Sequence, residues 1–136
     1  MTSTDAGRPT PRQTRQRAEI RHAVEVLASF ATAQEIHDRM RHDGCSVGLA
    51  TVYRTLQAMA AGGELDSLRI PDGQVAYRTC SPGHHHHLIC RSCGRTVEVA
   101  LPPLETLVAT MAADHGFARI DHEVEFFGTC AACAAP

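Results

Sequence analysis

Residues 80–93 read C-S-P-G-H-H-H-H-L-I-C-R-S-C, and the rest of the chain is organised around this stretch. It holds four histidines and three cysteines, the side chains that bind zinc best. Farther along, Cys130 and Cys133 repeat the two-residue gap between Cys90 and Cys93. Two pairs at matched spacing predict a closed four-sulfur zinc site. Redox cycling of each pair is the alternative, and the matched spacing favours the metal.

The histidine run predicts two further sites because successive side chains of an extended strand point to opposite faces. His84 and His86 would then face one side, and His85 and His87 the other. Each pair would supply two ligands to a different site. The alternative is a histidine-rich loop that binds metal weakly.

Each histidine pair needs partners from elsewhere in the chain. His122 is an unexpected polar residue on an apolar strand face, and Glu105 lies in the first turn of an expected helix. Cys80 lies next to the run and is either a ligand or a buried thiol. Spacing alone does not choose among the upstream acids Glu64, Asp66 and Asp72. Cys45 has no ligand neighbour in sequence, and we interpret it as structural.

Composition limits the class of protein. The 136 residues suffice for one ordinary domain or two small ones. The chain has no signal peptide after Met1 and no apolar run near the ~18 residues of a membrane span, so we expect a cytoplasmic protein. In that compartment six cysteines favour metal binding over disulfides. Five arginines within the first 22 residues form a basic arm suited to a phosphate backbone, or else a solvated tail.

The first 79 residues predict a winged helix-turn-helix. A disordered leader covers residues 1–11, and helices are expected over residues 14–28, 33–43 and 49–61. Thr32 and Glu35 form the capping box of the second helix, and Gly62-Gly63 ends the third. Strands at residues 65–70 and 74–79 flank the turn Pro71-Asp72-Gly73 and form the wing.

Residues 80–83 are the expected hinge, and residues 84–136 are expected to form a small α/β dimerisation domain. Strands are predicted at residues 85–90 and 96–100, and a helix from Pro102 to about Gly116. The last strand, residues 118–127, alternates between an apolar face with His122 and an acidic face that includes Glu125. The fold class is therefore α+β.

The third helix is the candidate DNA reader. Thr51 and Arg54 project away from its apolar stripe, and Tyr53 lies on the flank. A hydroxyl, an aromatic face and a guanidinium suit a major groove. A solvated helix face is the alternative, and the basic arm and the wing favour DNA.

Four stretches carry a family resemblance: V-G-L-A-T-V-Y-R-T-L (47–56), the following G-G-E-L-D, H-H-H-H-L-I-C-R-S-C-G (84–94) and F-F-G-T-C-A-A-C (126–133). Over about residues 14–133 the chain resembles the ferric uptake regulator (Fur) family, and within it the zinc uptake regulator branch. The resemblance implies a homodimeric, metal-dependent transcriptional repressor that binds an inverted-repeat operator in double-stranded DNA.

The resemblance also implies roles for individual residues. The structural zinc would be held by Cys90, Cys93, Cys130 and Cys133. The regulatory zinc at the hinge would be held by Asp66, Cys80, His85 and His87, and a third site by His84, His86, Glu105 and His122. Tyr53 and Arg54 match base-contacting positions, and Arg15 or Arg17 phosphate-contacting ones.

We therefore expect a zinc-responsive repressor that binds two to three zinc ions per subunit and controls zinc uptake genes. The thiolate of Cys80 is a soft ligand that favours zinc over iron, although a regulator of iron is the first alternative. A zinc buffer and a zinc enzyme or thiol oxidoreductase are further alternatives. We expect no enzyme, because each proposed site has four protein ligands and leaves no open position for water.

Overall fold

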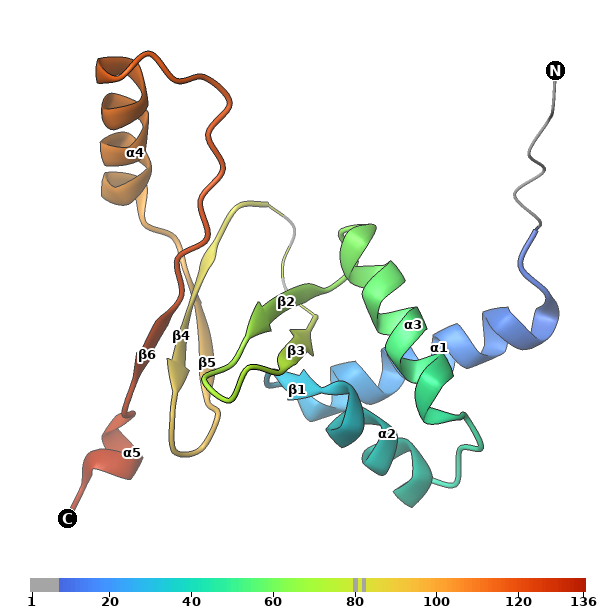
Figure 1. The fold of residues 1–136 in the computed structure, drawn as a ribbon. Helices are drawn as coiled ribbons and strands as arrows, with labels where there is room; N and C mark the ends of the chain where they lie inside the picture. Colours follow the sequence, from blue (N-terminus) through green and yellow to red (C-terminus); the bar gives the residue numbers. More distant parts are fainter. Residues whose placement is uncertain (1–7, 80, 82) are drawn as a thin grey trace, which may run out of the picture. The chain divides into compact units, whose positions relative to one another are not determined.

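The computed structural model describes residues 8–79, 81 and 83–136. The chain divides into two units, Met1–Cys80 and Ser81–Pro136. The elements of the first unit are α1 (Pro11–Leu27), β1 (Ala31–Thr32), α2 (Ala33–His42), α3 (Leu49–Ala61), β2 (Asp66–Arg69) and β3 (Val75–Arg78). Those of the second are β4 (His86–Cys90), β5 (Thr96–Val99), α4 (Pro102–Asp114), β6 (Phe126–Gly128) and α5 (Ala131–Ala134) (Figure 1).

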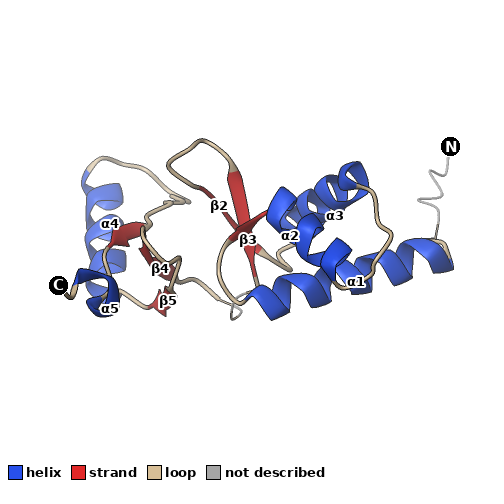
Figure 2. Cartoon of the chain, turned by 90° about the horizontal axis from the view of Figure 1, so that it is seen from below, coloured by secondary structure: helices blue, strands red, loops and turns tan. Residues whose placement is uncertain are grey.

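The first unit is a winged helix with a continuous apolar core. One side chain cluster joins α1, α2 and α3, and Ile20, Ile36 and Leu56 in it are completely buried. The three-stranded antiparallel sheet has the order β1-β3-β2 and forms the wing. Its strands β2 and β3 are drawn in red in Figure 2. This core fixes the direction of α3, whose opposite face is exposed.

Local signals place the helix ends. Thr32 accepts from the backbone N–H of Glu35, which completes the expected capping box, and α3 has the predicted bounds. The predicted start of the first helix is wrong, because Thr10 and Gln13 form a second capping box and Pro11 opens the helix. The expected leader therefore ends before Thr10, and its residues 1–7 lie outside the described part.

The second unit is built on a mixed sheet of order β5-β4-β6. The central strand β4 pairs antiparallel with β5 and parallel with β6, and α4 lies between β5 and β6 in sequence. Helix α5 follows β6 and was not predicted. Of the expected hinge, Cys80 and Pro82 lie outside the described residues, while the Ser81 N–H donates to Glu98 at 2.8 Å.

The predicted strand at residues 118–127 is wrong over most of its length. Only Phe126–Gly128 pair with β4, and Arg119 has a positive φ of 54° that no strand tolerates. The polar groups upstream of Phe126 bond to histidine side chains instead of to a strand ladder: the Val124 carbonyl lies 2.8 Å from His86 Nδ1, and Glu125 bonds to His87. Glu125, predicted on the acidic face of that strand, is consequently half-buried.

Candidate metal centres and DNA-contacting helix

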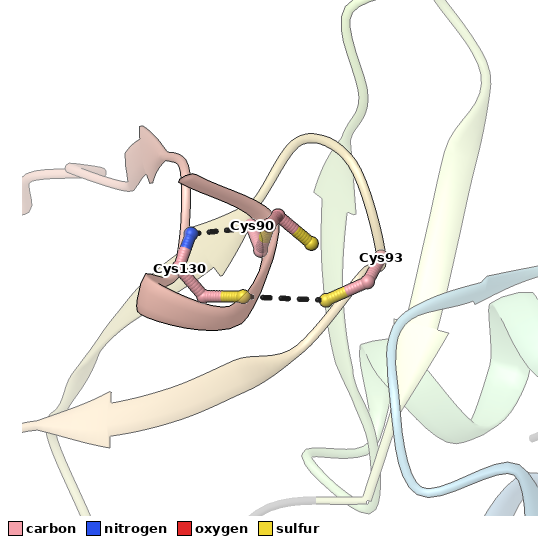
Figure 3. A group of neighbouring side chains, drawn as sticks. Cys90, Cys93 and Cys130 are labelled. Carbon is pink, nitrogen blue, oxygen red and sulfur yellow. Dashed lines mark hydrogen bonds between the residues drawn. The ribbon is translucent and has the colours of Figure 1, made fainter. Parts of the chain in front are cut away.

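Four cysteine sulfurs converge at one end of the second unit. Cys90 ends β4, and Cys93 follows in the adjoining turn. Cys130 directly precedes α5, and Cys133 lies within it. The parallel register that pairs Cys90 with Gly128 brings the two sequence pairs together. All four sulfurs lie within 4.8 Å of one another, and the sulfurs of Cys93 and Cys130 face each other at 3.7 Å (Figure 3). This donor set fits a tetrahedral zinc site.

The thiols of this cluster ionise unequally. The Cys130 backbone N–H donates to Cys90 Sγ at 3.3 Å and, with further N–H donors, lowers the pKa of Cys90 to about 6. Bonds from the Cys133 backbone N–H and side chain lower the pKa of Cys130. Cys133 bonds to the other three sulfurs as a thiol, which raises its pKa to about 12. Without a cation, therefore, the cluster disfavours full ionisation, and a divalent metal would remove that conflict.

A second cluster joins β4 to α4 and to the segment before β6. The Nε2 atoms of His84 and His86 each lie 2.9 Å from Glu105 Oε1, and His122 Nε2 lies 3.1 Å from Glu105 Oε2. The Nε2 atoms of His84 and His122 are 3.1 Å apart. The four ligand atoms all lie within 4.8 Å of one another, and three imidazoles with a carboxylate suit zinc.

Hydrogen bonds to the carboxylate shift the pKa of both partners in this cluster. The bond to Glu105 raises the pKa of His86 although burial opposes it, and the His86 side chain is only 3 % exposed. In return the bond from His86, followed by those from His122 and His84, lowers the pKa of Glu105 although its desolvation acts the other way. A positively charged group is thus favoured at the centre of the cluster, whether it is a proton or a metal ion.

The remaining two histidines of the run form a separate pair. The ring centroids of His85 and His87 lie 4.8 Å apart, and the His87 side chain is 4 % exposed. His85 Nδ1 lies 2.9 Å from the Gly83 carbonyl oxygen. Of the other ligands expected with this pair, Asp66 begins β2 in the first unit and pairs in register with Arg78, and Cys80 lies outside the described residues.

Sequence reasoning missed Glu125. Its Oε2 lies 2.8 Å from His87 Nδ1 and also accepts from the His87 backbone N–H at 2.9 Å. One signal was available: Phe127, at a position of the acidic face two residues after Glu125, breaks the period-two pattern.

Cys45 and His37 are residues of ligand type in the first unit that lie outside the metal-ligand clusters. Cys45 is half-buried and packs against the apolar core, which fits the structural role expected for it. His37 has a buried Nδ1 without a hydrogen-bond partner among the described residues, and Asp38 Oδ1 lies 3.9 Å from it.

The exposed face of α3 carries the residues expected to read DNA. Tyr53 is 43 % exposed, Arg54 is exposed, and Arg54 Nη2 lies 3.5 Å from Thr51 Oγ1. A groove between α1 and α3 is lined by both basic and hydroxyl side chains, namely Thr14, Arg17, Thr51, Arg54 and Thr55. Such a lining suits a phosphate backbone.

The two arginines expected at phosphates have different surroundings. Arg15 pairs with Glu19 at 3.2 Å and its side chain is 83 % exposed. Arg17 and Arg21 both pair with Glu64, the residue two positions before β2. Arg17 therefore reaches the groove as part of an ion-paired cluster, whereas Arg15 extends into solvent.

A winged helix followed by a small domain with two internal clusters of metal ligands defines a class of metal-binding winged-helix protein. Residues 10–127 match the Ferric uptake regulator family, and the chain belongs to this family.

Zinc uptake regulators are among the known proteins that this chain resembles. The zinc uptake regulation protein of Mycobacterium tuberculosis H37Rv is 51 % identical over 122 residues, which cover 90 % of this chain and 94 % of that protein. The crystal structure of FurB from M. tuberculosis, described as a zinc uptake regulator, is also 51 % identical, with a TM-score of 0.55 over 90 % of this chain and 95 % of that one. A zinc uptake regulator complexed with zinc and DNA is 27 % identical, with a TM-score of 0.72 over 96 % and 86 %.

Among the described residues, no helix combines the length and the apolarity that a bilayer-spanning segment needs.

Proposed function

We propose that this protein is a cytoplasmic, zinc-responsive transcriptional repressor that binds operator DNA as a homodimer and controls zinc uptake genes. The observation that carries the proposal is the 51 % identity to a zinc uptake regulation protein over nine-tenths of the chain. A winged helix and clustered zinc ligands in one chain supply the two activities that such a repressor needs.

Each subunit binds two to three zinc ions in this proposal. The four cysteines hold a structural zinc, and the mutual approach of their four sulfur atoms, a full set of tetrahedral ligands, supports this. His84, His86, Glu105 and His122 hold a further zinc. Both sets consist of residues from the second unit alone, so these two ions stabilise that unit.

The regulatory zinc binds His85 and His87 together with Asp66 and Cys80. Because Asp66 belongs to the first unit and the histidines to the second, this ion ties the two units across residues 80–83. A thiolate ligand favours zinc over iron. Filling the site shifts the population toward one arrangement of the reading helices, and a coupling of ~1–3 kcal/mol changes operator affinity by up to about 150-fold.

The DNA-binding surface comprises α3 and the start of α1. Tyr53, Arg54 and Thr51 face base edges, and Arg15 and Arg17 contact phosphates. The exposure of Tyr53 and Arg54 on the face opposite the buried core supports this assignment. Two copies of α3 in a symmetric dimer would read the two halves of an inverted repeat.

An exposed apolar row supports the homodimer. Leu88 pairs in register with Val97 on one side and with Phe126 on the other, so the three share one sheet face. They are 47 %, 40 % and 38 % exposed. On α4, Leu107 and Met111 of the predicted apolar stripe are 64 % and 50 % exposed. Such surfaces are typical of protein interfaces, and a second copy of the chain would bury them.

The test is a zinc-titrated operator-binding curve at fixed salt, measured by fluorescence anisotropy. We expect tight binding of the wild type only with zinc.

Cys80→Ser and His87→Ala should lose the zinc response, whereas Cys45→Ser, a matched thiol change outside the clusters, should keep it. A Cys80→Ser protein with an unchanged zinc response would refute the regulatory site, and a wild type that ignores DNA would favour a zinc buffer.

A further inference from the structure

His87 is held at two points by a single carboxylate. Glu125 Oε2 accepts from the His87 backbone N–H at 2.9 Å and lies 2.8 Å from Nδ1 of the same residue. The His87 side chain is 4 % exposed and that of Glu125 is 25 % exposed. A buried ring with one nitrogen fixed in this way has little freedom to rotate.

The contact also determines which ring nitrogen is available to a metal. A carboxylate oxygen that already accepts from a backbone N–H accepts from Nδ1–H as well, so the proton of the neutral imidazole resides on Nδ1. The lone pair is then on Nε2. Histidine ligands of zinc commonly have this arrangement, with a carboxylate behind the ring, because it fixes the tautomer and increases the basicity of the ligating nitrogen.

Neighbouring histidines are oriented by a weaker kind of acceptor. His85 Nδ1 lies 2.9 Å from the Gly83 carbonyl oxygen, and His86 Nδ1 lies 2.8 Å from the Val124 carbonyl oxygen. Both acceptors are neutral backbone groups. The Nδ1 of His87, by contrast, lies against a charged side chain, and a substitution can remove that partner.

The parallel pairing of β4 with β6 explains why Glu125 reaches His87. Leu88 and Phe126 are the first pair of this parallel ladder, so the residues just before them, His87 and Glu125, lie side by side. Because Glu125 precedes β6, its carboxylate can bond to both the backbone and the ring of His87.

We propose that Glu125 is a positioning residue of the regulatory site: it holds His87 with Nε2 directed at the zinc ion. This inference rests on the proposed function, because it takes His87 as a ligand of the regulatory zinc.

The experiment measures cobalt binding to full-length protein that retains zinc in the four-cysteine cluster. Cobalt bound to the Cys80 thiolate gives a charge-transfer band that the third site, which lacks sulfur, cannot give. Cys80→Ser, which should lose the band, identifies the signal. Chelator competition then gives the affinity of wild type, Glu125→Ala, Glu125→Gln and the control Glu123→Ala, which removes an exposed acid two residues away.

We expect Glu125→Ala to weaken metal binding by about 10- to 100-fold. Glu125→Gln keeps an acceptor oxygen without the charge and should show a smaller loss, and Glu123→Ala should bind as the wild type does. Long-range nitrogen–proton NMR of protein with the regulatory site empty should find His87 protonated on Nδ1 in the wild type and in a mixture of tautomers in Glu125→Ala.

Wild-type affinity in both Glu125 variants, or an unchanged tautomer in Glu125→Ala, would overturn the inference. If Glu125→Ala does not fold, the isosteric Glu125→Gln decides. A wild type without the thiolate band refutes instead the regulatory site of the proposed function, so the two failures are distinguishable.

Discussion

The two units of the chain are stabilised by different means. Among the described residues, the buried apolar side chains belong to the first unit with the exceptions of Ile89 and Cys90. The second unit instead buries two histidines, His86 and His87, and helix α4 has no buried residue. The first unit therefore has an ordinary apolar core, whereas the buried interior of the second unit consists largely of metal-ligand side chains.

This difference indicates what each unit requires to fold. A unit of fewer than 80 residues buries a smaller fraction of its surface than a larger domain does, and without a sufficient core it needs a metal, disulfides or a partner subunit. The second unit offers clustered zinc ligands and an exposed apolar row for a partner. The first offers neither and has a core that suffices. Four predictions test this contrast, in order of decreasing effect.

Removal of the structural zinc should have the largest effect. A structural zinc contributes ~10–16 kcal/mol in small peptides, as much as the stability of a whole domain. We expect a strong chelator, or Cys90→Ser, to abolish the dispersed amide NMR signals of the second unit while those of the first persist. Cys45→Ser should leave both sets intact. Dispersed second-unit signals in zinc-free protein would refute the contrast.

Truncation in the apolar core should destabilise the other unit. Leu56 is completely buried, and Leu56→Ala should lower the free energy of unfolding of the first unit by ~2–5 kcal/mol. Urea unfolding followed by far-UV circular dichroism measures it, and the zinc content should not change. Val26→Ala, at a 42 % exposed position of α1, is the control and should cost far less. Loss of zinc from the Leu56 variant would show that the units are not independent.

The histidine cluster should respond to pH when only the structural zinc is bound. Because Glu105 raises the pKa of His86, the NMR titration midpoint of His86 should lie above the ordinary 6.5. The ion pair then stabilises the unit fully below pH 6.5 and loses that contribution as pH rises through the raised midpoint. Zinc must displace this proton, so third-site affinity should fall about tenfold per pH unit below the midpoint. Glu105→Gln should lower the midpoint, and an unchanged midpoint would contradict the assignment.

The surface ion pairs of the first unit should contribute least. Arg17, Arg21 and Glu64 are each about one-third exposed or more, so Glu64→Gln should cost about 0–1 kcal/mol of stability. Releasing Arg17 should slightly strengthen operator binding at low salt, and added salt should remove the gain. Glu25→Gln, which neutralises an exposed acid of α1, the helix that carries Arg17, controls for the change in net charge. Weaker binding by the Glu64 variant would mean that Glu64 holds Arg17 in its DNA-contacting position.

Much of the first unit could be predicted because its signals are local. The Thr32–Glu35 capping box and Gly62 define helix ends without reference to the rest of the fold. The Thr10–Gln13 box was equally visible, and the prediction overlooked it. Strand β1 could not be predicted, since two residues are too few for a period and their pairing with β3 depends on tertiary structure.

The segment before β6 shows why alternation alone can mislead. Residues 118–125 have a strand-like pattern, but a strand also requires a partner for its backbone groups. Here the Val124 carbonyl and the Glu125 carboxylate bond to histidines of β4. The nature of the partner, and not the pattern, decided the conformation.

The sequence by itself determined the kinds of ligand, the two matched cysteine pairs and the separation of alternate histidines, because these follow from side chain chemistry and from the covalent geometry of neighbouring residues. Only the tertiary structure decided that Glu105 and His122 meet His84 and His86, and that Glu125 lies behind His87. Those contacts join residues 17 to 38 positions apart. The parallel pairing of β4 with β6 creates the contact of Glu125, and no local pattern encodes that pairing.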